Sequence, residues 1–386
     1  MQTKNLIIGI AIYVASALAS YILFANFLSV GGSLITPVAE PAKEGERTVF
    51  DDSLPKTEEC PLNGIRYSKQ QRSWWEKHRP LGVMIENHQE ARPQSGVSFA
   101  DVVYEAVAEG GITRFLAVYY CRDAGIIGPI RSARTYFLDF ISEYGDYPLY
   151  THVGGANTPG PADALGQIES YGWQVYNDIN QFSVGFPTFW RDYERLGHPV
   201  ATEHTMYSTT EKLWEVAAKR KLTNKDEDGN SWDENLVKYG FKDDESLDRR
   251  PSAQSASFSF WEGHNDYIVE WVYDKTSNNY LRKNGGVSHT DKDTDGQLSA
   301  KNVVILFMRE SRANDGYEGN LHLLYGTKGT GNAIVFMDGA RFDTTWSKKD
   351  RTSRLILKDK AGGEIKFNRG VIWFEVLPIG KAIDVK

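Results

Sequence analysis

Hydrophobic and polar residues follow two different patterns along the chain, and the pattern changes near residue 254. Between residues 79 and 223, strand-like apolar runs are interspersed with segments of helical spacing. The strand-like runs are 80–87, the two arms of 102–120 and 147–155, and the helical segments begin near 130, 161 and 208. We therefore expect an α/β or α+β domain over residues 79–223.

The part of the chain after residue 254 contains short apolar runs separated by glycine-rich turns. Runs such as "YIVEWVYD" alternate apolar and polar residues, which is typical of a half-buried strand. Residues 254–386 are therefore predicted to form a smaller, antiparallel β-rich domain. Residues 224–253 are polar and highly charged, and we interpret them as a linker or an insertion.

The N-terminal region contains an uncharged apolar run of 25 residues, 6–30, which is long enough to cross a bilayer as one helix. Lys4 precedes the run and an acidic segment follows it, so residues 1–5 are predicted to be cytoplasmic and the main body extracytoplasmic. An uncleaved signal anchor is favoured over a signal peptide cleaved near "ALAS" (17–20), because apolar residues continue past that point. Residues 31–78, rich in proline, glycine and charge, are predicted to be a flexible tether.

The overall charge of −7 argues against a nucleic-acid partner held by bulk electrostatics. The hydrophobic content of 41% is sufficient for a packed core. The chain has two cysteines, Cys60 and Cys121, which form either one disulfide or two buried thiols; the sequence leaves both open.

The stretch "GPIRSARTY" (128–136) is predicted to open an amphipathic helix, with Pro129 in its first turn. Packing of the apolar face requires neither Arg131 nor Arg134. Arginines oppose the helix dipole at this end, so their presence points to an anion site formed with free backbone N–H groups. The alternative is that they pair with acidic side chains and fasten the fold; the candidates are Asp139, Glu143 and Glu105.

Several polar residues at predicted strand ends and helix starts are candidates for a shared crevice. The candidate ligand-binding residues are Arg114, Arg131, Ser132, Arg134 and Asn157. The candidate general bases are His152, His204 and Glu105. Each of these three also has a structural interpretation, as a hydrogen-bonded residue of the core.

No cofactor or metal site is expected from the sequence. The run "DKDTDG" (291–296) resembles the start of a calcium loop, but the twelfth position is Asn302 rather than a bidentate glutamate. The glycine-rich "GTKGTGNA" (326–333) lacks the ending of a phosphate-binding P-loop.

Long motif blocks in this chain resemble the YerB-like family of predicted bacterial lipoproteins, a domain of unknown function. The resemblance covers residues 79 to 386 and implies an envelope location and the two-domain organisation. The blocks are "RPLGVMIENHQEARPQSGVSFADVVYEAVAEGGITRFLAVYY", "GPIRSART", "THVGGAN", "EHTMYS", "HTDKDTDGQLSAKNVVIL", "GTGNAIVFMDGARFDTTWSKKD" and "GEIKFNRGVIWFEVLP". Many relatives carry a lipobox, which this chain lacks.

A more distant resemblance is to the LytR-CpsA-Psr phosphotransferases, which hold a polyprenyl pyrophosphate with arginines. The order of a membrane anchor, Arg114, the arginines of "IRSART" and a "GGAN" turn is similar, but the metal-binding aspartates of those enzymes are not matched. Three hypotheses follow. The protein binds an anionic, phosphate-bearing envelope ligand, it is a phosphotransferase or hydrolase acting on such a ligand, or it is a scaffold for an envelope protein.

Overall fold

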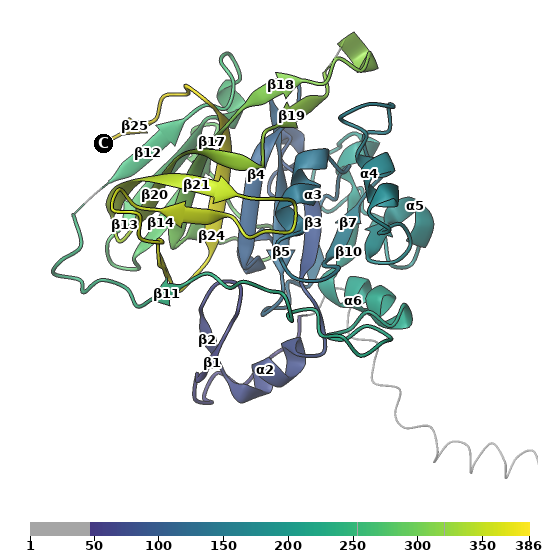
Figure 1. The fold of residues 1–386 in the computed structure, drawn as a ribbon, viewed down its shortest axis with the longest axis horizontal. Helices are drawn as coiled ribbons and strands as arrows, with labels where there is room; N and C mark the ends of the chain where they lie inside the picture. Colours follow the sequence, from purple (N-terminus) through teal and green to yellow (C-terminus); the bar gives the residue numbers. More distant parts are fainter. Residues whose placement is uncertain (1–46, 253, 320) are drawn as a thin grey trace, which may run out of the picture. The chain divides into compact units, whose positions relative to one another are not determined.

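The computed structural model describes residues 47–252, 254–319 and 321–386, in which most elements are strands and the helices are few and short (Figure 1). The predicted cytoplasmic N-terminus (1–5), membrane helix (6–30) and first part of the tether (31–46) lie outside the described residues. Within those described ranges, no helix has the length and apolar character needed to cross a membrane.

A sheet of ten strands runs through the molecule and takes strands from both halves of the chain. Its order is β22-β21-β20-β17-β24-β4-β5-β3-β7-β8. The strands from the N-terminal half are β3 (Leu81–Glu86), β4 (Val102–Glu109), β5 (Ile112–Tyr119), β7 (Leu149–His152) and β8 (Asp178–Asn180). Those from the C-terminal half are β17 (Asn302–Met308), β20 (Gly329–Met337), β21 (Ala340–Lys348), β22 (Ile356–Lys358) and β24 (Ile372–Pro378).

The two halves join where β24 pairs with β4 in parallel, with Glu375 opposite Glu105. β17 also pairs with β24 in parallel, so the C-terminal half is not purely antiparallel as its alternation pattern suggested. The alternation predicts which residues are buried on a strand, but it does not specify the direction of the partner strand. The predicted domains at 79–223 and 254–386 thus share one sheet.

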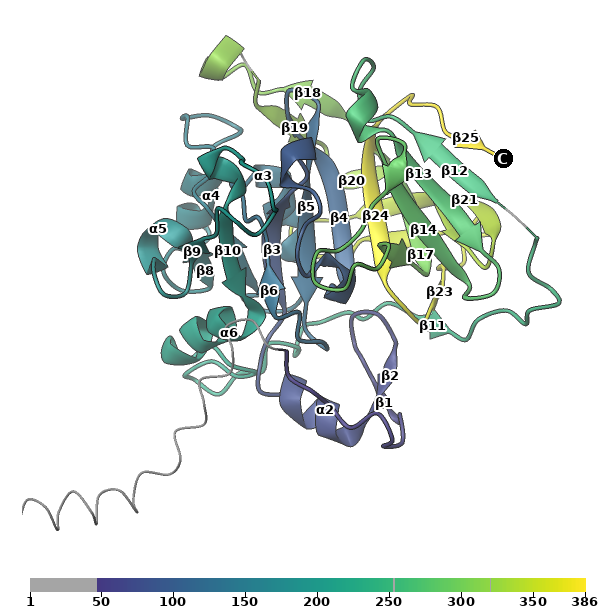
Figure 2. The same ribbon diagram turned by 180° about the vertical axis from the view of Figure 1, so that it is seen from behind.

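Except for α2, the α-helices gather at the β3–β8 end of this sheet, while the opposite end carries strands (Figures 1 and 2). The α-helices are α2 (Lys69–Trp75), α3 (Thr135–Ile141), α4 (Ala164–Ser170), α5 (Gln181–Val184) and α6 (Thr210–Lys219). Short 3₁₀ turns are η1 (Gln89–Ala91), η2 (Val97–Phe99), η3 (Thr202–His204), η4 (Asn265–Tyr267) and η5 (Tyr317–Gly319). All seven residues of α3 are buried, so this helix is part of the core and not a surface element.

A second, antiparallel sheet belongs to the C-terminal half, with the order β15-β14-β13-β12-β25 and β16 paired to β14. Its strands are β12 (Ser255–Phe258), β13 (Val269–Asp274), β14 (Asn279–Asn284), β15 (Val287–Ser288), β16 (Ser299–Ala300) and β25 (Asp384–Val385). β13 alternates buried and half-buried residues, as predicted from "YIVEWVYD".

Smaller pairings complete the fold. They involve β1 (Glu58–Glu59), β2 (Arg66–Tyr67), β6 (Ile126–Ile127), β9 (Trp190–Arg191), β10 (Met206–Thr209), β11 (Phe241–Lys242), β18 (Glu310–Arg312), β19 (Leu323–Tyr325) and β23 (Phe367–Asn368). β11 lies in the charged segment 224–253 and pairs with β23, so this pairing attaches the segment to the C-terminal half.

Part of the predicted tether is folded, which corrects the prediction for residues 47–78. This segment forms β1, β2 and α2, and Cys60 is joined to Cys121 by a disulfide. Leu62 and Trp75 are almost fully buried. The prolines and charges of the segment suggested a flexible linker, but these two apolar side chains pack into the core and hold the segment against it.

The stretch "GPIRSART" precedes helix α3 instead of opening it, which corrects the predicted helix start. The helix begins at Thr135, and Ile130 and Ala133 form isolated β-bridges to Ile85 and Gly155. The backbone N–H groups of Ile130, Arg131 and Ala133 donate to distant carbonyl groups in these and neighbouring strands. They are therefore not free to bind an anion, and the helix-terminus site is lost.

Candidate functional site

A polar cluster forms where three segments meet at the end of β3. The N–H of Glu86 donates to the carbonyl of Pro129 at 2.9 Å, and the N–H of Arg131 donates to Met84 at 2.9 Å. Ile130 N–H in turn donates to the carbonyl of Met206 at 2.7 Å. These backbone bonds bring the end of β3, the 129–131 segment and the start of β10 together.

We call the resulting group the histidine cluster and define it as Glu86, His88, Glu90, Arg131 and His204. His204 Nδ1 lies 2.8 Å from Glu86 Oε2, and its Nε2 lies 3.7 Å from Glu90 Oε2. Arg131 Nε approaches the other oxygen of Glu86 at 3.2 Å. The rings of His88 and His204 stack with centroids 4.7 Å apart.

The histidines of this cluster have opposite electrostatic environments. The hydrogen bond that His204 donates to the Glu86 carboxylate raises the pKa of His204 above its ordinary value. Burial lowers the pKa of His88, and the neighbouring His204 lowers it further. Protonation is therefore easier at His204 than at His88.

A second group, the arginine cluster, consists of Glu109, Arg114, Arg131 and Arg134. Glu109 Oε1 lies 2.7 Å from Arg114 Nη2, and its other oxygen pairs with Arg134. Burial alone would raise the pKa of Glu109, but the two guanidinium groups outweigh it and hold the pKa at about 2. The acidic partners are thus Glu109 for Arg134 and Glu86 for Arg131, and neither is among the three expected from sequence.

Arg131 differs from the other two arginines in its exposure. Its side chain is 23% exposed, against 4% for Arg114 and 6% for Arg134. Arg114 and Arg134 also donate to the backbone carbonyls of Ser132 and Ala133. The two terminal nitrogens of Arg131 have no hydrogen-bond partner within the described ranges, so they are available to a ligand.

The other residues predicted for ligand binding have limited roles here. Ser132 contributes its backbone carbonyl, which accepts from Arg114 Nη1 at 3.2 Å. Asn157 is exposed on the loop after β7 and, among the described residues, forms no hydrogen bond or ion pair with either cluster.

His152, a predicted general base, is fully buried in β7. Its Nε2 lies 2.5 Å from Asp178 Oδ1, and its Nδ1 lies 2.6 Å from the carbonyl of Gly154. Both ring nitrogens are occupied by the protein and neither reaches solvent. This geometry supports the structural interpretation of His152.

Glu105, another predicted general base, belongs to a buried group at the junction of the two halves. We call this group the seam and define it as Glu105, Arg282, His289 and Glu375. Arg282 Nη2 lies 2.6 Å from Glu105, its Nη1 lies 3.0 Å from Glu375, and its Nε donates to His289 at 3.2 Å. Glu105, Arg282 and Glu375 have no exposed area, so the seam fits a structural role.

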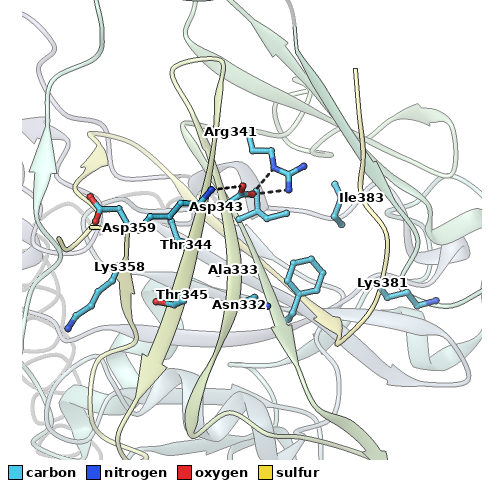
Figure 3. A pocket seen from close by; sticks show the side chains of 13 residues that line it. Asn332, Ala333, Arg341, Asp343, Thr344, Thr345, Lys358, Asp359, Lys381 and Ile383 are labelled. Atoms are coloured by element: carbon cyan, nitrogen blue, oxygen red, sulfur yellow. Dashed lines mark hydrogen bonds and ion pairs between the residues drawn. The ribbon is translucent and has the colours of Figure 1, made fainter. Parts of the chain in front are cut away.

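A hollow of about 480 Å³ lies apart from these groups, on β20 and β21 of the C-terminal half (Figure 3). Arg341 pairs with Asp343 across its wall, as the dashed lines in Figure 3 show. Its basic lining residues are Arg341, Lys358, Lys360 and Lys381, and its acidic ones are Asp343 and Asp359. The hollow is therefore moderately basic and is a second place where an anion could bind.

Glu86, His88, Arg131 and His204 all stand at predicted strand ends or beside predicted helix starts, where polar residues are expected to converge in one crevice; Glu90 was not expected there. Glu86 lies at the end of the strand predicted at 80–87 and His88 directly follows it, which is the signal for crevice residues. The pairing of Glu86 with His204 spans 118 residues, and no local pattern encodes it.

Comparisons with known proteins agree with this architecture. Residues 64–223 match the model described as "Protein of unknown function (DUF3048) N-terminal domain", and residues 257–374 match the model of its C-terminal domain. The protein named "Putative lipoprotein YerB" from Bacillus subtilis (strain 168) is 28% identical over 333 residues, covering 85% of this chain and 89% of the relative.

A solved structure shares the fold. The crystal structure of YerB protein from Bacillus subtilis superposes with a TM-score of 0.69 at 23% sequence identity. The likeness covers 86% of this chain and all of the other. With both family domains matched in order, the chain belongs to the YerB-like DUF3048 family, whose function is unknown.

Proposed function

We propose that the protein is a membrane-anchored envelope protein that binds an anionic, phosphate-bearing ligand through Arg131. The name of the Bacillus subtilis relative supports an envelope location, as does the apolar run at residues 6–30. In this proposal the N-terminus is cytoplasmic, and the described residues lie outside the membrane.

The observation that carries the ligand proposal is the state of the Arg131 guanidinium. It is partly exposed, and its terminal nitrogens are unpartnered by the described part of the chain. Buried Arg114 and Arg134 add positive charge beside it, and Glu109 and Glu86 compensate two of the three positive charges. A guanidinium in this position offers a fork of N–H donors to phosphate oxygens.

Inorganic pyrophosphate is a suitable probe for this site, used with the full-length protein in detergent and with EDTA present. Replacing Arg131 with alanine is expected to weaken pyrophosphate binding about tenfold or more, measured by calorimetry. Arg249→Ala, at a highly exposed arginine, is the matched control and should leave binding unchanged. Absence of pyrophosphate binding to the wild type would contradict the proposal.

A second pair of variants tests the hollow in Figure 3 as the competing location. If Lys358→Ala together with Lys381→Ala abolishes binding while Arg131→Ala does not, the anion site is in the hollow. Unfolding measurements provide a check on Arg131, which should stabilise the fold by less than about 1 kcal/mol because its pair with Glu86 is partly exposed.

The other hypotheses have weaker support. A phosphotransferase or hydrolase would need a general base within reach of the ligand, and His204 is the one of the three predicted bases that lies beside Arg131, with Glu86 orienting its largely buried ring. Turnover of a lipid-linked pyrophosphate by the full-length protein, lost in His204→Ala, would favour the enzyme. Among the described residues, no observation favours a protein scaffold over the binding protein.

A further inference from the structure

We infer that His88, Glu90 and His204 form a binding site for a divalent transition-metal ion of the zinc class. This inference is separate from the proposed anionic ligand, because it depends only on these three side chains and on Glu86. One ring nitrogen from each histidine and one carboxylate oxygen of Glu90 lie within 4.8 Å of one another.

The distances are close to those that a bound ion requires. Ligand atoms 2.0–2.2 Å from a tetrahedral zinc ion are separated by about 3.4 Å. His204 Nε2 and Glu90 Oε2 are already 3.7 Å apart. A shift of a few tenths of an ångström therefore brings this pair to bonding geometry.

Glu86 prepares His204 for the role of a ligand. Its carboxylate lies 2.8 Å from Nδ1 and holds the proton on that nitrogen, so that Nε2 can present its lone pair toward Glu90. A carboxylate on the far side of a metal-binding imidazole is a common arrangement, because it fixes the tautomer and increases the basicity of the ligand.

The remaining two ligands have the freedom to close the site. The Glu90 side chain is 52% exposed. His88, the residue that precedes η1, is only partly buried. His88 stacks on His204 at an angle of 11° and must tilt out of this stack to point its nitrogen at the ion. The tilt also replaces the long 3.3 Å contact between His88 Nδ1 and the backbone of Glu90.

The charge and chemistry of the site favour a transition-metal ion. Glu86, Glu90 and the nearby Glu203 bring three carboxylates to a place where Arg131 is the neighbouring guanidinium. Two imidazoles with one carboxylate suit zinc and similar ions, whereas calcium and magnesium prefer all-oxygen sites. Three protein ligands leave a coordination position open for water or for an oxygen of a ligand.

The other metal-like grouping in the described part of the chain does not compete. Cys60, Asp101 and Cys121 lie close together, but both sulfur atoms are bonded to each other in the disulfide. They are therefore not available as thiolate ligands.

The test uses the full-length, untagged protein in detergent, stripped with EDTA and then titrated with ZnCl₂ in competition with a chromophoric chelator. The wild type is expected to bind one zinc ion per chain. His88→Ala and Glu90→Gln should each weaken zinc affinity at least tenfold, and Glu86→Gln should weaken it 10- to 100-fold through His204. His198→Ala, at an exposed histidine six residues before His204 that is not a member of the cluster, is the control.

His88 and Glu90 are the decisive variants, since their exposure allows substitution without loss of the fold, which circular dichroism verifies. If the wild type binds no zinc, or if both variants bind it as the wild type does, the inference is overturned. Because zinc alone is the probe, the result of the zinc titration does not depend on the result of the pyrophosphate experiment. Magnesium titrated in the same way should bind at least tenfold more weakly than zinc.

Discussion

The seam and the histidine cluster are built from the same three residue types, yet they differ in how completely those residues are partnered. In the seam, Arg282 uses all three sides of its guanidinium, contacting Glu105, Glu375 and His289, and also lies against the ring of Trp373. In the histidine cluster, Arg131 leaves its terminal nitrogens unused, and Glu90 is half exposed.

This difference separates a polar group that fixes a fold from one that can take a ligand. A buried arginine is tolerated only if its charge and donors are satisfied within the protein, and such a group has no capacity for a ligand. A cluster at the surface can retain free donors and lone pairs, because water satisfies them until a ligand arrives. The candidate site is therefore identified by side chains that lack some of their hydrogen-bond or ion-pair partners, and not by the residue types alone.

Breaking the seam should have the largest effect on stability. Arg282→Ala leaves Glu105 buried without a counter-charge and removes the donor to Glu375, and the free energy of unfolding should fall by about 3–5 kcal/mol. Denaturant unfolding followed by tryptophan fluorescence measures this change. Arg249→Ala, at a highly exposed arginine, should change it by less than about 0.5 kcal/mol. Equal effects of the two variants would contradict the structural role of the seam.

Removing His204 should have an intermediate effect that depends on pH. Glu86 raises the pKa of His204 in the folded protein, so its stabilising contribution is full below the unfolded pKa of about 6.5 and is lost as pH rises through the folded pKa. With EDTA present, His204→Ala should cost about 2 kcal/mol at pH 5.5 and less at pH 8.5. Chemical unfolding at both pH values measures the difference. A loss of stability that grows with pH would contradict the raised pKa of His204 in the folded protein.

Of the three substitutions, Glu375→Gln should have the smallest effect on stability. Burial and the facing Glu105 hold the pKa of Glu375 well above its ordinary value, and no donor within the described ranges contacts its Oε2. The raised pKa favours the protonated form of Glu375, and the amide group of glutamine can replace its carboxyl group without a change of charge. The change in the free energy of unfolding should stay within about 1 kcal/mol.

The pH dependence gives this prediction its direction. A raised carboxyl pKa means that the folded wild type keeps a proton which the unfolded chain releases above about pH 4.5, so wild-type stability declines with rising pH in this range. The Gln variant has no carboxyl group at this position, so its stability does not decline for this reason. Its stability relative to the wild type should therefore increase from pH 5 to pH 8, and a decrease would show that Glu375 is ionised.

Local patterns predicted much of the secondary structure. The hairpin of β4 and β5 was expected from the apolar arms around Gly110 and Gly111, and both glycines adopt positive φ in the turn. The strand at residues 80–87 and the helices near 161 and 208 were also expected, and correspond to β3, α4 and α6. These elements are determined by side-chain periodicity and turn residues close in sequence.

Features that depend on distant segments were not predictable in this way. Ile130 and Ala133 fit helical spacing, but bonds to β3, to Gly154 and to β10 hold the stretch extended. The choice of Glu109 as partner of Arg114 and Arg134, and of His204 as partner of Glu86, arises from the assembled sheet. The candidate residues Arg131 and His204 could be named from sequence, while their partners could not.

The pairing of β24 with β4 also has a consequence for the order in which the chain can acquire its structure. During synthesis β4 emerges long before β24, the strand that covers its open edge. Until then the earlier half presents an unsatisfied row of backbone N–H and C=O groups, which invites pairing with other chains. A chain that stops after residue 223 would keep that edge permanently, so each family domain depends on the other for its completion.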